Sequence, residues 1–204
     1  MPSIDFSRRK ARGGQQKLPP NPEQWGFEHN GLDLRDDLGI GHDERLPVPR
    51  VFELLPSTVV LAHGKVPAAE SYLNHFRNDG VGRWSGLAVS MPDGSEVVLY
   101  NDAHPETRVR STLMEEFFHL RLGHPRSSVR IIGGEDGFRT YNSATEIEAY
   151  ASGAAALVPY GVLRRMIHDG FAVRSIARLF AVSEELVKYR LKVTKLFRRA
   201  VGRR

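Results

Sequence analysis

The sequence has 204 residues, of which 41% are hydrophobic and 26% charged, and this composition excludes a wholly disordered chain. It has no cysteine, which excludes disulfide bonds and cysteine-based zinc sites, so any metal must be held by histidine and carboxylate side chains. No apolar run approaches the roughly 18 to 20 residues that span a bilayer, and the basic N-terminus lacks the apolar stretch of a secretory signal. We therefore expect a cytoplasmic protein that does not enter the membrane.

The formal charge is +5, and the basic excess is concentrated near the two ends of the chain. Such runs can bind phosphates or anionic surfaces, or they can simply keep the termini solvated. Residues 1–45 are rich in Gly, Pro, Asn, Asp and Arg and show no sustained hydrophobic period. We expect a largely irregular N-terminal arm there, with Trp25 and Phe27 as candidates for contacts with the remaining chain.

The ordered domain is expected over residues 46–199. Its first part contains a short helix over 49–56, a β-branched strand over 58–62 and a further helix over 68–76. A hairpin follows, with strands at 87–89 and 97–100. Its turn contains Pro92-Asp93-Gly94, which combines a fixed φ, a side-chain acceptor and a residue that tolerates positive φ.

From residue 112 onward the sequence predicts helices at 112–122, 144–158, 160–168, 172–180 and 184–199. Strands followed by helices in a chain of this length indicate an α+β fold. We expect a small antiparallel sheet packed on a helical C-terminal half.

The segment from Thr112 to His124 carries the candidate chemistry. In a helix, Glu115 and His119 are four residues apart and share one face, with Glu116 one position round from Glu115. This is the layout of HExxH, in which residues i and i+4 hold zinc and the intervening Glu acts as general base. Here the first His is replaced by Glu, so the motif reads EExxH.

A structural alternative exists for the same residues. Thr112-x-x-Glu115 also fits a capping box, in which Glu115 bonds to the first amide of the helix. His119 would then be an ordinary, partly buried histidine. This segment alone leaves both interpretations open.

A second segment, over residues 143–159, begins with two acids and continues with small apolar residues that suit close helix packing. Ser143-x-x-Glu146 fits a capping box, which gives Glu146 a structural role. Glu148 precedes an apolar run and has no such role. A carboxylate there needs a partner, either a metal or the helix dipole.

Taken together, these segments resemble the ImmA/IrrE family of metallopeptidases. The matching residues, in order, are Asn101, Arg108, Thr112-Leu113, Glu115-Glu116, His119, Gly123-His124, Glu148-Ala149, Ala154, Leu157 and Pro159. A later stretch, Ser175 to Leu191, is similar to the C-terminal pattern of that family.

The resemblance implies a zincin-like fold and a zinc-dependent endopeptidase whose protein substrate is a helix-turn-helix transcriptional repressor. It places Glu115, His119 and Glu148 as zinc ligands and Glu116 as the general base. Tyr150 stands where the family usually has Asn. His124 is assigned to the end of the helix, with a ligand role as the alternative.

Two other functions remain open at this stage. Residues 172–199 resemble a helix-turn-helix with a basic second helix, which would suit a DNA-associated regulator, and residues 200–204 form a basic tail. The unusual EExxH motif would also fit a catalytically inactive zincin-like module that only binds a partner protein.

Overall fold

The computed structural model describes residues 22–66, 74, 84–125, 129–130, 138–139 and 143–196. Within these ranges the elements follow in this order: α1 (Pro22–Leu38), α2 (Val48–Val51), η1 (Phe52–Leu54), β1 (Thr58–Ala62), η2 (His63–Lys65), β2 (Gly86–Ser90), β3 (Glu96–Tyr100), α4 (Glu106–Arg121), β4 (Val129–Arg130), β5 (Phe138–Arg139), α5 (Ser143–Leu157), α6 (Tyr160–His168), α7 (Val173–Phe180) and α8 (Glu184–Val193). The expected α+β class is confirmed. The helix expected over 68–76 lies outside the described residues except for Asn74, which is helical.

The main sheet has the order β1-β3-β2, so β3 is central and β1 and β2 are edge strands. β2 and β3 form the expected antiparallel hairpin, but β1 runs parallel to β3. The sheet is therefore mixed rather than purely antiparallel. A parallel pair needs a long crossover connection, and the segment between β1 and β3, residues 63–95, which includes β2, supplies that length.

The hairpin turn has the predicted chemistry. Gly94 has a φ of +81°. The Asp93 carboxylate accepts bonds from the Ser95 amide at 2.9 Å and from the Ser95 hydroxyl at 2.7 Å. Gly94, which has no Cβ, and the Asx turn made by Asp93 together reverse the chain and set the register of β2 against β3.

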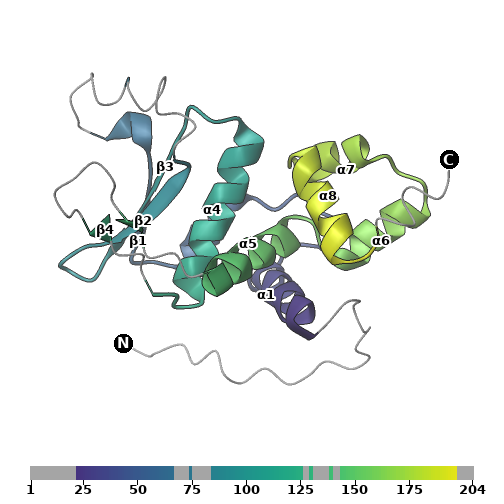
Figure 1. Ribbon diagram of the computed structural model, residues 1–204, viewed down its shortest axis with the longest axis horizontal. Coiled ribbons are helices and arrows are strands. Elements are labelled where there is room, and N and C mark those ends of the chain that lie inside the picture. The colour runs from purple at the N-terminus through teal and green to yellow at the C-terminus, as the bar shows by residue number, and fades with distance from the viewer. Residues whose placement is uncertain are drawn as a thin grey trace.

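Helix α4 lies between the sheet and α5 (Figure 1). Its buried side includes Met114, Phe117 and Phe118, and the rings of Phe117 and Phe52 meet edge to face with centroids 5.6 Å apart. The helix begins at Glu106, six residues before the predicted start at 112. Thr112 is thus an interior, buried helical residue, and the Thr112–Glu115 capping box is wrong.

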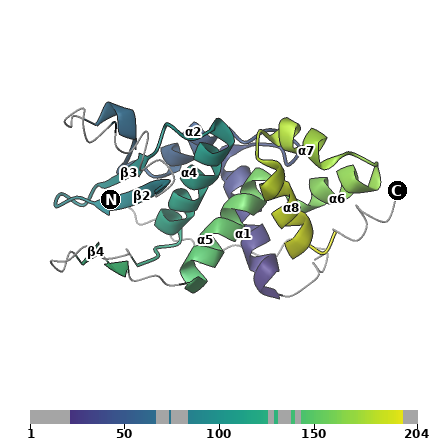
Figure 2. The ribbon, with the colours of Figure 1, turned by 45° about the horizontal axis from the view of Figure 1, so that its top comes forward.

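Residues 22–38 correct the expected irregular arm, because they form helix α1, which lies beside α5 (Figure 2). The helix was missed because its buried face contains Glu28 and Arg35 as well as Phe27, so no apolar period marks it. Gly31 allows the close approach. A Cβ on this residue would lie 2.5 Å from the backbone nitrogen of Ala156.

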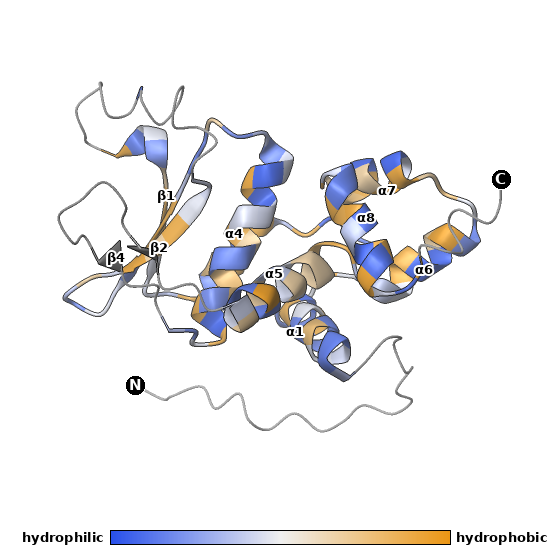
Figure 3. Cartoon of the chain, viewed as in Figure 1, coloured by the Kyte–Doolittle hydropathy of each residue, from blue (hydrophilic) through white to orange (hydrophobic). Residues whose placement is uncertain are grey.

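The C-terminal helices form a small group in which α7 packs on α8 and α8 contacts α5. Figure 3 shows polar and apolar faces on α6, whereas the C-terminal half of α5 is pale to orange. α8 ends at Val193, short of the predicted 199. Lys195 has a φ of +55°, and the Leu196 amide donates to the Leu191 carbonyl at 2.9 Å, which closes the helix with a Schellman turn.

None of the helices in the described ranges combines the length and the apolar character needed to cross a membrane.

Candidate metal centre

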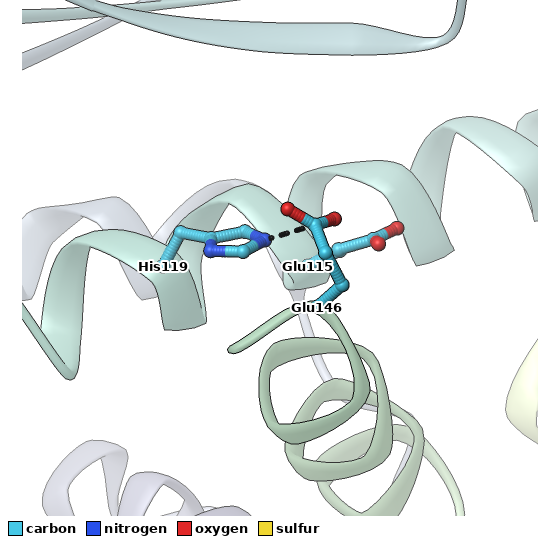
Figure 4. Close-up of side chains that lie close together, drawn as sticks. All are labelled: Glu115, His119 and Glu146. Carbon is cyan, nitrogen blue, oxygen red and sulfur yellow. Dashed lines mark ion pairs between the residues drawn. The ribbon is translucent and has the colours of Figure 1, made fainter. Parts of the chain in front are cut away.

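The candidate metal centre lies where the N-terminal end of α5 approaches α4. Glu115 and His119 project from one face of α4, and Glu146 reaches them from the first turn of α5 (Figure 4). One ligand atom from each of these three side chains lies within 4.8 Å of the other two. The pairing of Glu115 with His119 was expected from their spacing. The contribution of Glu146 was not.

The imidazole of His119 and the carboxylate of Glu146 point toward each other in Figure 4. His119 Nε2 and Glu146 Oε2 are 3.6 Å apart, and both side chains are less than a quarter exposed. One nitrogen and two carboxylates form the kind of donor set that binds zinc. Glu146 had been assigned a capping role, but its carboxylate lies against His119.

The carboxyl group of Glu115 is destabilised in its charged form by its surroundings at this centre. Its pKa is raised to about 7, first because burial disfavours the carboxylate and then because the charges of Glu116 and Glu146 lie close to it. Glu115 and Glu146 thus converge on one histidine, and the charge of Glu116 lies close to Glu115. A cation held among them would relieve that repulsion, so the charge distribution suits a metal.

Glu148, predicted as a metal ligand, is not part of this three-residue group. Its Oε2 lies 3.2 Å from Nε2 of His124. His124 in turn contacts His119, with the two Nδ1 atoms 3.0 Å apart. Glu148 is thus linked to the metal centre through His124, one residue further out than the sequence suggested.

Glu116, the predicted general base, lies on α4 near strand β2. A Cβ placed on Gly86 of β2 would be 3.5 Å from Glu116 Cγ and only 2.6 Å from Thr112 Cγ2. The Glu116 charge also contributes to the raised pKa of Glu115. Glu116 therefore lies close both to the acidic group and to an edge strand of the sheet.

Two further side chains with groups that can donate a hydrogen bond, Tyr150 and His104, have partners in the structure. Tyr150 is one helical turn beyond Glu146, and its ring packs edge to face on Tyr189 with centroids 5.0 Å apart. Burial, then Tyr189 and Glu115, raise the pKa of Tyr150, so its hydroxyl keeps its proton at neutral pH. His104 is bonded through Nε2 to the Trp84 carbonyl at 3.0 Å.

Residues 66–192, more than half of the chain, match the IrrE N-terminal-like domain, which defines a peptidase family. The chain belongs to the ImmA/IrrE family. No curated protein sequence matches it.

The ImmA/IrrE family is a family of metallopeptidases. In this member of the family, Glu115, His119 and Glu146 form a group of side chains that could hold a metal ion. The family resemblance also drew attention to Asn101 and Arg108. Asn101 is fully buried and its side-chain oxygen accepts a bond from the Ala103 amide at 3.1 Å. Arg108 donates to the Ser85 hydroxyl at 2.8 Å. The first contact lies within the loop before α4, and the second ties α4 to the residue that precedes β2.

Sequence reasoning missed Glu146 and the contact between the two histidines. The sequence did contain a signal for Glu146. This residue is an acid in a helix of otherwise mostly small and apolar residues, two positions before Glu148 and four before Tyr150. The histidine contact follows from Gly123, whose φ of +68° turns His124 back onto the last turn of α4.

Proposed function

We propose that this protein is a zinc-dependent endopeptidase. In this proposal Glu115, His119 and Glu146 hold the metal and Glu116 is the general base. The observation that carries it is the approach of the three ligand atoms to within 4.8 Å of one another. The match of the chain to a peptidase family supports the reaction class.

The residues fit the ion. Donor atoms bound to one tetrahedral zinc at about 2.0–2.1 Å lie roughly 3.4 Å apart. The 3.6 Å between His119 Nε2 and Glu146 Oε2 is close to this value. The ligand atom of Glu115 lies within 4.8 Å of the other two, and a bound cation would favour deprotonation of its carboxyl group.

When bound, zinc supplies Lewis-acid polarisation of the scissile carbonyl and of the attacking water. The remaining work belongs to the protein. The Glu116 carboxylate accepts the proton that the water loses and passes it to the departing amine. The Tyr150 hydroxyl, which stays protonated at neutral pH, serves in this proposal as a donor to the developing negative charge.

The substrate in this proposal is a protein segment in an extended conformation. β2 is an edge strand of the main sheet, and Glu116 lies beside its first residue, Gly86. Such an edge can pair with an added strand through backbone hydrogen bonds. The resemblance to the ImmA/IrrE family suggests a helix-turn-helix transcriptional repressor as the natural substrate, and a cytoplasmic location would suit it.

Glu148 remains the alternative third ligand. Zinc content of the purified protein and of three single variants separates the two assignments. We expect stoichiometric zinc in the wild type and in Glu116→Gln, substantial loss in Glu146→Gln, and retention in Glu148→Gln. Loss in Glu148→Gln with retention in Glu146→Gln would restore Glu148 as the ligand. A wild type that takes up no zinc would contradict the proposal.

The alternative is a binding module without catalysis. It is favoured by one observation, the carboxylate at position 115 in place of the usual imidazole, since an anionic ligand makes zinc a weaker Lewis acid. A wild type that binds zinc stoichiometrically yet cleaves no candidate repressor, in any metal-loaded state, would support this alternative.

A further inference from the structure

Helix α4 ends in a Schellman motif that folds one histidine onto another. The Gly123 amide donates to the Leu120 carbonyl at 3.2 Å, and the His124 amide donates to the His119 carbonyl at 3.0 Å. Gly123 has the left-handed φ, +68°, that this motif requires. In most such motifs the two side chains brought together are apolar. Here they are the imidazoles of His119 and His124.

The two rings are hydrogen-bonded rather than only packed. Their Nδ1 atoms are 3.0 Å apart, and the ring planes are inclined at 75°. The opposite nitrogen of His124, Nε2, lies 3.2 Å from Glu148 Oε2. The His124 side chain is only 7% exposed, whereas Glu148 is 41% exposed. A hydrogen-bonded chain therefore runs from solvent at Glu148, through a buried ring, to the candidate ligand His119.

This chain has a direction. An ionised carboxylate can only accept, so His124 Nε2 carries a proton and donates it to Glu148. A neutral imidazole has one donor and one acceptor, which makes His124 Nδ1 the acceptor. His119 must then donate from Nδ1. In the neutral His119 ring the lone pair is then on Nε2, which lies 3.6 Å from Glu146, too far for a hydrogen bond that would require a proton on that atom.

We propose that His124 and Glu148 are positioning residues that hold His119 in the tautomer whose Nε2 can bind a metal. This inference rests on the proposed metal site. Histidine ligands of metals generally donate their second ring N–H to an acceptor, which fixes the ring and strengthens the ligand. Here the acceptor is another imidazole, oriented in turn by a carboxylate. This positioning role also explains why Glu148, an acid at the start of an apolar stretch, has His124 as a partner and is not itself a ligand.

His124 does not serve as a ligand in this arrangement. Both of its ring nitrogens are engaged, one with His119 and the other with Glu148. Moreover, it approaches His119 on the Nδ1 side, whereas Glu146 lies on the Nε2 side.

The first test needs no variant. Long-range ¹H–¹⁵N NMR of the metal-free wild-type protein reports which nitrogen of each imidazole is protonated. We expect His119 to carry its proton on Nδ1 and His124 on Nε2. A His119 ring protonated on Nε2 would overturn the inference, whatever the metal affinity.

The second test measures affinity for Zn²⁺ by competition with a chelator and the absorption spectrum of the Co²⁺-substituted protein. His124→Phe keeps a ring but removes the acceptor, and we expect zinc affinity to fall by about 10- to 100-fold. His124→Asn can still accept the Nδ1 proton of His119, so it should recover much of that loss. Glu148→Ala should fall between the wild type and His124→Phe.

The Co²⁺ spectrum separates a positioning residue from a ligand. Saturated His124→Phe and Glu148→Ala should keep the wild-type band positions, because the same three side chains hold the ion. Shifted bands would mean that a ligand had been removed and would contradict the inference. His168→Phe, at the exposed end of α6, is the matched control and should change neither quantity.

The two proposals fail differently. A wild type that binds neither Zn²⁺ nor Co²⁺ overturns the proposed function, while the NMR result still decides the tautomer. If the wild type and His124→Phe bind zinc with equal affinity, the metal site stands and the positioning role of His124 is overturned.

Discussion

Glu28 on α1 and Arg190 on α8 form an ion pair in which both side chains are almost fully buried, although 162 positions separate them in the sequence. Glu28 also accepts a bond from the Tyr160 amide at 2.6 Å, at the start of α6. Arg190 donates through Nε to the Val158 carbonyl at 3.0 Å. One carboxylate and one guanidinium thus connect α1, the junction of α5 and α6, and α8.

Removing one partner of this pair is expected to be costly. Glu28→Ala leaves the Arg190 guanidinium buried without its countercharge, and we expect the free energy of unfolding to fall by about 3–5 kcal/mol in urea denaturation. Glu185→Ala is the control, because Glu185 pairs with Lys188 on the exposed side of α8 and should change stability by less than about 1 kcal/mol. Equal effects of the two substitutions would contradict the role assigned to the buried pair.

The contact between α1 and α5 gives a second prediction. In Gly31→Ala the new methyl would lie 2.5 Å from the Ala156 nitrogen and 2.8 Å from the Ala155 carbonyl carbon, both backbone atoms that cannot move aside cheaply. We expect a loss of about 1–3 kcal/mol in the free energy of unfolding.

Gly26 provides the matched control on the same helix, since a Cβ there meets nothing within 4 Å. Gly26→Ala should raise stability by roughly 0.5–1 kcal/mol, because Ala loses less backbone freedom than Gly in a helix. If Gly31→Ala behaved like Gly26→Ala, the two helices would not pack as closely as the structure indicates.

The raised pKa of Glu115 predicts a pH dependence of the metal-free protein. Its pKa of about 7 in the folded state exceeds the ordinary value of 4.5, so the folded state binds this proton more tightly than the unfolded state. The contribution of Glu115 to stability therefore falls as the pH rises from about 4.5 to about 7 and stays low above that. Glu115→Gln, which cannot ionise, removes this loss.

Thermal unfolding of EDTA-treated protein measures the effect. The Tm of Glu115→Gln relative to that of the wild type should be higher at pH 8 than at pH 4.5. Comparing the two proteins at each pH cancels the titration of the groups that do not interact with Glu115, so the remaining difference reports Glu115 and its acidic neighbours. A Tm difference that does not change with pH would show that the Glu115 carboxyl group is not perturbed in this way.

Glu116 is expected to affect turnover without affecting metal binding. Glu116→Gln keeps the size of the side chain but cannot accept a proton, so we expect kcat for peptide hydrolysis to fall by about 10²- to 10⁴-fold. Zinc affinity should remain close to that of the wild type. A variant that lost its zinc together with its activity would instead indicate that Glu116 helps to hold the metal.

Strand β2 and helix α4 are expected to be coupled at Gly86. Gly86→Ala places a methyl 2.6 Å from Thr112 Cγ2, and we expect it to cost about 1–3 kcal/mol in stability. Thr112→Ser deletes that methyl. The double variant should therefore recover part of the loss, and a double-mutant cycle gives the coupling. Strictly additive effects would mean that the two residues do not touch.

Local chemistry was enough to predict much of the fold from the sequence. The β-branched run at 58–62, the hairpin around Asp93 and Gly94, and most of the helices after residue 142 were found because each depends on neighbouring residues. The pairing of Glu115 with His119 belongs to the same class, since a spacing of four residues in one helix fixes a shared face. The family resemblance, carried by the order of these motifs, is confirmed by the match over residues 66–192.

What tertiary structure alone decided lies between elements. Helix α1 buries Glu28, and that is favourable only because Arg190, far along the chain, meets it. β1 took a parallel place beside β3, which no local pattern specifies. The sequence also offered two acids on α5, Glu146 and Glu148, and helical periodicity does not say which of them faces another helix. The approach of α5 to α4 brought Glu146 to His119 and turned Glu148 to His124, because packing between helices, unlike a helical period, is set by the whole core.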